Sequence, residues 1–215
     1  MCFFELIIVI LVADDELIMT SSYYNFLGSE FKNKEVKAGK VLISEPFLND
    51  NNFSRSVVLI TEHNEKGSFG LILNKPIEKN LSDIVSGFDN VQIPLFAGGP
   101  VDHNTLHVIH SIGLEVPGAI QISENLFWGG DFDYLRTLDE AHNLYPQMVK
   151  FFIGYSGWMS NQLDAEIKAK SWVVTTLKPE EVFNLPPEDM WNLCLQSLGG
   201  KFKEWLNFPV DPILN

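Results

Sequence analysis

The sequence predicts an α+β protein, a single domain with a mixed, largely antiparallel sheet that contains a β-hairpin and is flanked by helices. Apolar, β-branched runs at 56–62 and 68–73 are typical of strands. The turn at 63–67 between them contains Asn and Gly, which indicates a hairpin. Because strand and helix patterns then follow each other without a strict βαβ alternation, a mixed sheet is favoured over a parallel one.

The other elements are predicted from short apolar runs and from helical spacing next to an end signal. Strand-like runs lie at 41–43, 94–100 (ending in a tight loop), 105–110, 119–122, 148–155 and 172–176. Helices are predicted after Asn80 (with Leu81, Ile84, Val85 and Phe88 on one face), over 131–142, after 156–157, and over 187–198, where Pro187 opens the first turn and Gly199 follows the end.

The composition is that of one globular domain, which we place at 37–215 after an N-terminal extension at 1–36. The chain has 215 residues, 46% hydrophobic and 20% charged, enough to bury a core without disulfides or a structural metal. Lys and Arg number 15 against 28 Asp and Glu, a net charge of −13. An acidic protein with only two arginines, Arg55 and Arg136, is poorly suited to phosphate, so direct binding of nucleic acid is not expected.

The first residues are apolar but differ from a signal peptide, because the first basic residue is Lys32 and Glu5 interrupts the run. The run is also shorter than the roughly 20 residues of a membrane-spanning helix. We interpret it as an extra strand or a loose leader upstream of an alternative start at Met19. The two cysteines, Cys2 and Cys194, lie near opposite ends of the chain, which favours free thiols in a reducing cytoplasm.

The segment 154–158 places Ser156 where a predicted strand turns into a predicted helix. Hydrolases hold a nucleophilic serine in this context within a G-x-S-x-G pattern, although Trp158 stands here at the final glycine. Two alternatives are that Ser156 caps the helix, or that free backbone N–H groups at the turn receive an anion. We favour helix capping.

Three histidines, His103, His107 and His110, have a spacing that would suit zinc on a helix. The stretch 105–110 alternates as a strand, however, which places His107 and His110 on opposite faces. No metal is therefore predicted. No cofactor is predicted either, because the loop at 98–100 lacks the Lys-Ser/Thr of a nucleotide-binding P-loop.

Several sequence blocks, each present once, follow one another in a characteristic order along the chain. They are 39–48, 53–63, 70–76, 98–101, His110, and 154–158 followed by Gln162, Leu163 and Glu166. Taken together, they resemble the YqgE/AlgH family of bacterial proteins, with Asn161 standing where that family usually has Gly. The resemblance implies a cytoplasmic protein without an established reaction or cofactor. One branch of the family carries the label of a transcriptional regulator, which fits this acidic chain better if regulation acts through a partner than through DNA.

We predict a non-enzymatic cytoplasmic protein that binds a partner protein or a small ligand and has an indirect regulatory role. The predicted ligand-binding residues are Arg55, Lys75, Gly99, His110, Ser156 and Trp158. The two cations would hold an anionic group, and the indole would offer a stacking face. Three alternatives stay open: a hydrolase or transferase that uses Ser156 or His110, a direct transcriptional regulator, and a structural role in which Arg55 and Asn74 satisfy buried groups.

Overall fold

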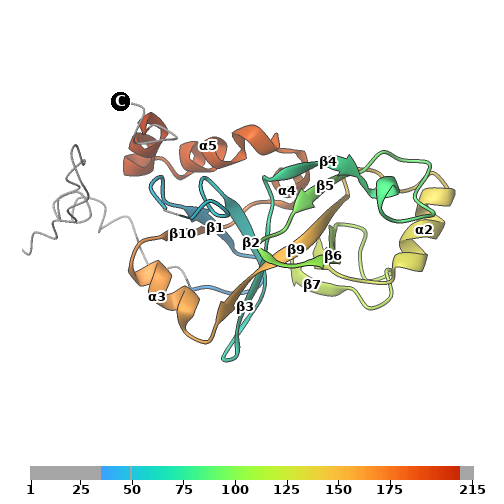
Figure 1. Cartoon of the computed structure of the whole chain (residues 1–215), viewed down its shortest axis with the longest axis horizontal. Coiled ribbons are helices and arrows are strands. Elements are labelled where there is room, and N and C mark those ends of the chain that lie inside the picture. The colour runs from blue at the N-terminus through green and yellow to red at the C-terminus, as the bar shows by residue number, and fades with distance from the viewer. Residues whose placement is uncertain (1–34, 49, 209–215) are drawn as a thin grey trace, which may run out of the picture.

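The computed structural model describes residues 35–48 and 50–208. The predicted extension at 1–36, with Cys2 and Met19, therefore lies almost wholly outside the described residues. Within them, an open sheet of ten strands runs through the molecule, with helices grouped at its ends and on one face (Figure 1). The predicted α+β class is confirmed.

The strands pair in the order β10-β1-β2-β3-β9-β6-β8-β7, and β5, paired with β4, also joins β9. Their bounds are β1 Val41–Ser44, β2 Val57–Asn64, β3 Gly67–Ile72, β4 Pro76–Asn80, β5 Pro94–Ala97, β6 Val101–His110, β7 Ile120–Ser123, β8 Leu126–Trp128, β9 Val149–Met159 and β10 Trp172–Thr175. The predicted hairpin is the antiparallel pair β2–β3. Among the described strands, the β5–β9 pair is parallel and the other pairs are antiparallel.

Four α-helices lie among the described residues. They are α2 Phe132–Glu140, α3 Gln162–Lys168, α4 Pro179–Asn184 and α5 Pro187–Leu198, and the 3-10 helices are η1 Leu81–Asp83 and η2 Gly200–Asn207. The helices expected over 131–142 and 187–198 are confirmed, and the Asp131 side chain caps α2 by accepting from the backbone N–H of Asp133 and Tyr134. The strands β4 and β8 and the helices α4 and η2 were not predicted.

The helix predicted after Asn80 is wrong beyond its first turn, which is the 3-10 helix η1. Leu81 and Phe88 are buried as the apolar stripe required, but Ile84 is 41% exposed. Gly87 then adopts a φ of +85°, a left-handed conformation that ends helical geometry. An apolar stripe of only two turns does not stabilise a helix enough to continue it up to this glycine.

The strand predicted over 148–155 is longer than expected, and this overturns the predicted strand-to-helix turn at Ser156. β9 continues through Ser156 and Gly157 to Met159, because residues 67–70 of β3 pair with residues 156–159. The next helix, α3, begins only after Asn161, whose φ of +62° is left-handed. Asn tolerates this conformation better than most residues other than Gly, so the helix start follows Asn161 and not Ser156.

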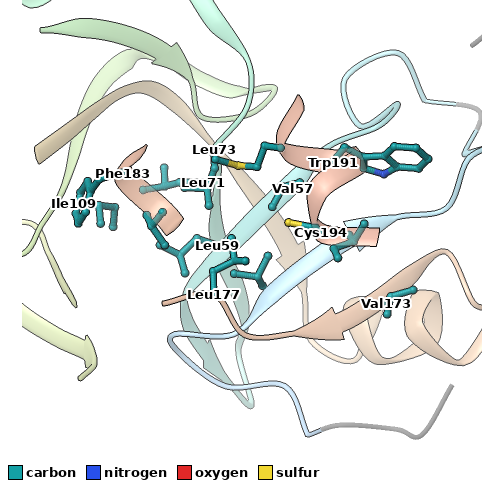
Figure 2. Packing of buried hydrophobic residues seen from close by; sticks show 14 of the residues in the cluster. Val57, Leu59, Leu71, Leu73, Ile109, Val173, Leu177, Phe183, Trp191 and Cys194 are labelled. Atoms are coloured by element: carbon teal, nitrogen blue, oxygen red, sulfur yellow. The ribbon is translucent and has the colours of Figure 1, made fainter. Parts of the chain in front are cut away.

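The largest apolar cluster lies between the strands β1, β2, β3 and β10 and the helices α4 and α5. Figure 2 shows Cys194 of α5 close to Val57 of β2, while the Trp191 ring extends from the same helix away from Val57. The indole Nε1 of Trp191 donates a hydrogen bond to the Ser44 carbonyl at 3.0 Å. The helices α4, α5 and η2, which we call the helical layer, are thus attached to β1 by packing and by a buried hydrogen bond.

The long strand β9 joins the strands β10, β1, β2 and β3 to the strands β4 to β8. We call the place where its neighbour changes from β5 to β3 the β9 junction. Residues 151–153 of β9 pair with β5 on one edge, and its residues 156–159 pair with β3 on the same edge. Between them Gly154 has a φ of +66°, and Gly98 bridges the two partners: its N–H donates to the Ile153 carbonyl at 2.8 Å, and its carbonyl accepts from the Ile72 N–H at 2.9 Å. A Cβ on Gly98 would overlap the Gly154 carbonyl oxygen.

We predict that Gly98→Ala lowers the unfolding free energy by more than about 2 kcal/mol, because the added methyl would force β9 away from the junction. Urea denaturation followed by far-UV circular dichroism would measure the change. Gly118→Ala is the comparison variant: nothing lies within 4 Å of an added Cβ there, so we expect a smaller loss, from backbone strain at its φ of +76° alone. An equal loss in the two variants would contradict the proposed overlap.

Candidate functional site

Two predicted ligand residues, Gly99 and Ser156, meet at the β9 junction. A Cβ on Gly99 would overlap the backbone of Tyr155 and Ser156. The Ser156 side chain is fully buried, and its Oγ donates to the Gly98 carbonyl at 3.0 Å. A nucleophilic serine needs an exposed Oγ next to a base, whereas this hydroxyl is already used to hold two backbones together.

Trp158 lies two residues beyond Ser156, on the same face of β9, where it anchors α3. Its Nε1 donates to Glu166 Oε2 at 2.9 Å, and the Nε1 of Trp172 donates to the same oxygen at 2.7 Å. Gln162 Nε2 donates to the other oxygen, Oε1, at 2.9 Å. The Trp158 side chain is 6% exposed and packs against the rings of Phe53 and Trp172, so its ring faces are covered.

The predicted cations Arg55 and Lys75 come from neighbouring loops, which Asn74 connects. Asn74 accepts from the Val57 N–H and donates to the Arg55 carbonyl, both at 2.9 Å. The Arg55 guanidinium lies 5.0 Å from the centre of the Trp191 ring, and its Nη2 donates to the Phe208 carbonyl. Lys75 Nζ makes a long hydrogen bond of 3.4 Å to the Asn51 carbonyl. Asn74 therefore satisfies backbone groups, and Arg55 contacts the C-terminal helical layer.

His110 is fully buried near the far edge of the sheet. Its ring stacks on Phe127 at 5.6 Å between ring centres, and Nε2 lies 3.1 Å from the Gly129 carbonyl oxygen. Burial lowers its pKa, partly offset by the Gly129 carbonyl and the charge of Glu115. A neutral, stacked imidazole fits a core residue, and its contacts include none of the other predicted ligand residues.

Sequence reasoning missed a buried amine at Lys150 of β9. Its side chain is 4% exposed, and Nζ donates to the carbonyls of Val182 at 3.0 Å and Leu73 at 3.4 Å. The amine also lies 4.4 Å from the centre of the Phe96 ring. Burial lowers its pKa to about 8. Lys150 thus satisfies carbonyls at the end of α4 and just beyond β3, and its only sequence signal was a charge within an apolar strand.

Two further expectations concern metals and membranes. Among residues 35–48 and 50–208, no group of three His, Cys, Asp or Glu side chains is placed to hold a metal ion. No helix in the same residues has the length and apolarity needed to cross a bilayer.

Cys194 is a buried free thiol, and burial together with the charge of Glu181 raises its pKa to about 12.

Four half-buried rings from four strands gather on one sheet face, and we call them the aromatic cluster: Phe69, His107, Trp128 and Tyr155. Phe69 and Tyr155 stack with 4.2 Å between ring centres, and Trp128 lies 5.2 Å from Phe69. His107 contacts Phe69 at 5.1 Å and Tyr155 at 5.8 Å. The cluster packs against the edge of the largest core, where it remains partly open to solvent.

Exposed apolar side chains surround the aromatic cluster. Ile120, 54% exposed, pairs with Trp128 across β7 and β8, and Val101, 36% exposed, pairs with Tyr155 across β6 and β9. Met159, 77% exposed, follows Tyr155 and Gly157 on the same face of β9. The cluster and its rim form an apolar surface that sequence reasoning missed, because strand pairing alone brings these positions together.

The polar atoms of the cluster face outward. Within the part of the chain that the structure describes, the Tyr155 hydroxyl and the Trp128 Nε1 have no hydrogen-bond partner, and neither atom is buried. His107 Nε2 lies 3.0 Å from Thr105 Oγ1. Burial lowers the pKa of His107, although the nearby charge of Asp102 opposes the effect. The surface thus offers ring faces and unpaired donors, the features of interface hot spots.

Comparison with known proteins identifies close relatives. A model of the AlgH-like family matches residues 41–203. A UPF0301 protein of Bacteroides thetaiotaomicron is 43% identical over 178 residues, 82% of this chain and 90% of that protein. A UPF0301 protein of Chlorobium limicola is 40% identical over 181 residues, covering 84% of this chain and 97% of its own length.

Two solved structures resemble the described fold. The crystal structure of a Corynebacterium diphtheriae protein has a TM-score of 0.71 at 21% identity, covering 82% of this chain and 95% of the other. The solution structure of the AlgH protein from Pseudomonas aeruginosa has a TM-score of 0.63 at 26% identity, covering 82% and 98%. The arrangement of strands and helices therefore recurs in distant bacterial proteins.

We predict that Glu166→Gln lowers the unfolding free energy by about 1–3 kcal/mol, because an amide oxygen is a weaker acceptor for the two indole N–H groups and the amide nitrogen accepts none. Chemical denaturation would measure the loss. Glu78→Gln, an exposed carboxylate in β4, is the control and should change stability little. If both variants were equally stable, the carboxylate would not be what holds α3.

We also predict that raising the pH from about 7 to about 10 stabilises the wild-type protein relative to Lys150→Met. The folded pKa of about 8 lies below the ordinary value of 10.5. Between these values the unfolded chain binds more protons, so the unfolding free energy rises with pH, by about 2 kcal/mol. Urea denaturation measures the unfolding free energy of both proteins at each pH. The difference between them removes the contribution of groups that titrate in both. A flat or falling difference would contradict the buried, charged amine.

Proposed function

The chain belongs to the AlgH-like family, and on that premise we propose that it is a non-enzymatic protein that binds a protein partner through the aromatic cluster. The observation that carries the proposal is the half-exposed group of Phe69, His107, Trp128 and Tyr155, surrounded by exposed Val101, Ile120 and Met159. Aromatic side chains are enriched at the centres of protein interfaces, where they bury large areas at low entropic cost.

The state of the candidate catalytic residues supports a binding role over an enzymatic one. Ser156 and His110 are fully buried, and the Ser156 hydroxyl already donates to Gly98. Neither side chain can reach a substrate unless the sheet opens. A hydrolase or transferase reaction at these residues would therefore need a different arrangement of β9, the strand that holds the two halves of the sheet together.

A regulatory role fits this proposal if it acts through a protein and not through DNA. The net charge of −13 and the presence of only two arginines oppose binding to phosphate. Arg55 also lies against Trp191 and donates to the Phe208 carbonyl, so its guanidinium already has partners within the protein. Arg55 and Lys75 stay predicted ligands for a small anion, whereas the aromatic cluster is the surface with the area for a protein.

Site-specific photo-crosslinking tests the proposal. A benzoylphenylalanine at Met159, on the rim of the cluster, should give one discrete adduct in an extract of the source cells, identifiable by mass spectrometry. The same group at Tyr145, 52% exposed near the opposite end of β9, is the control and should not give that adduct. Equal adducts at both positions, or none at Met159, would overturn the assignment of the surface.

A further inference from the structure

The charges beside the aromatic cluster indicate what kind of partner it takes. Glu62 is exposed and pairs directly with Phe69 across β2 and β3, so its carboxylate leaves the same face of the sheet. Asp102 is exposed next to Val101 on β6, and its charge acts on His107. The cluster therefore has a carboxylate on the β2 side and another on the β6 side.

Basic groups also occur near this face: exposed His103 follows Asp102 on β6, and Lys37 and Lys40 flank Gly39, which contacts Ile122 and Ser123 of β7. The β2–β3 turn carries Glu65 and Lys66 next to each other, so their charges cancel at a distance. His107 belongs to the cluster, and burial lowers its pKa, which keeps the imidazole largely neutral at pH 7. The face is thus aromatic at its centre, with the carboxylates of Glu62 and Asp102 at its rim, within a chain whose net charge is −13.

Aromatic faces and carboxylates attract the same kind of group. A guanidinium or ammonium group over a Tyr, Trp or Phe ring gains from the ring's negative face, and a flanking carboxylate adds a charge-assisted hydrogen bond. Guanidinium groups are also weakly hydrated and stack on flat surfaces. The Tyr155 hydroxyl and the Trp128 Nε1 can also donate hydrogen bonds to backbone carbonyl oxygens of such a peptide.

We propose that the aromatic cluster binds a basic segment of the partner protein, with an arginine side chain lying on the outer face of the stacked Phe69–Tyr155 ring pair, between the carboxylates of Glu62 and Asp102. This inference rests on the proposed function and names the chemistry of the partner. It also explains the two carboxylates at the rim of an apolar surface: complementary charges speed encounter with a basic partner and repel acidic proteins.

Peptide titration tests the inference directly. The probe is a short peptide with arginines between leucines, and the matched peptide carries neutral citrulline in their place. Titrated into the isotope-labelled protein and followed by NMR, the arginine peptide should shift the backbone amides of Phe69, His107 and Tyr155 and bind at least about fivefold more tightly than the citrulline peptide.

Two charge-removing variants, Glu62→Gln and Asp102→Asn, should each weaken the arginine peptide about threefold. Both residues are exposed, and Asn tolerates the left-handed φ of +49° at position 102, so the fold should persist. Glu188→Gln, at an exposed carboxylate of α5 on the helical layer, is the control and should leave the affinity unchanged.

The other outcomes overturn the inference in distinguishable ways. Equal binding of the citrulline peptide, or no shift with either peptide while Met159 still crosslinks, would refute the cationic anchor and leave the proposed function standing. A loss with Glu188→Gln equal to that with Glu62→Gln would mean attraction to overall charge alone. A Met159 adduct to a second copy of this chain would replace the basic partner with self-association, and loss of the adduct altogether would remove both proposals.

Discussion

The fold depends on one close backbone contact, between Gly98 and Gly154, where β9 exchanges β5 for β3 as its neighbour. The Gly98 carbonyl accepts from the Ile72 N–H and from the Ser156 hydroxyl, while the Gly98 N–H donates to β9. Buried backbone groups must find such partners, and a side chain at Gly98 would occupy the space that the contact needs. The hairpin, the helical layer and the aromatic cluster all lie on strands that this junction aligns.

The same requirement accounts for the residue types of the most site-like motif of the chain. Close packing of backbones selects glycines and a small hydroxyl residue, which are also the residues of a nucleophile turn or an anion loop. Gly99 and Ser156 lie at the junction, and Trp158, two residues beyond Ser156 on β9, donates with Trp172 to Glu166. A glycine- and serine-rich block therefore indicates a catalytic turn only where the strand actually ends.

Local sequence patterns were sufficient to predict the elements whose limits do not depend on pairing with distant residues. The hairpin at 57–72, the strand at 41–44 and the helix at 187–198 follow from alternation, turn residues and end signals. The continuation of β9 past Gly154 does not, because it is fixed by pairing with residues 67–70, distant in sequence. The aromatic cluster was equally hidden, since positions 69, 107, 128 and 155 share a face only through the registers of four strands. Long-range pairing outweighs local propensity at both places.

The buried junction and the half-exposed aromatic cluster place stability and the proposed binding in different parts of one sheet. Residues of the junction are buried and hydrogen-bonded, and half-buried Glu166 accepts from two buried indoles, so substitution at either place acts on folding first. The aromatic cluster instead leaves ring area and two polar donors unburied, although aliphatic side chains would close that end of the core without exposed polar atoms. Glu62 and Asp102 lie outside the core altogether. A change at these carboxylates would alter the field over the rings while the packing beneath stays intact, so the proposed recognition can be tested there without disturbing the fold.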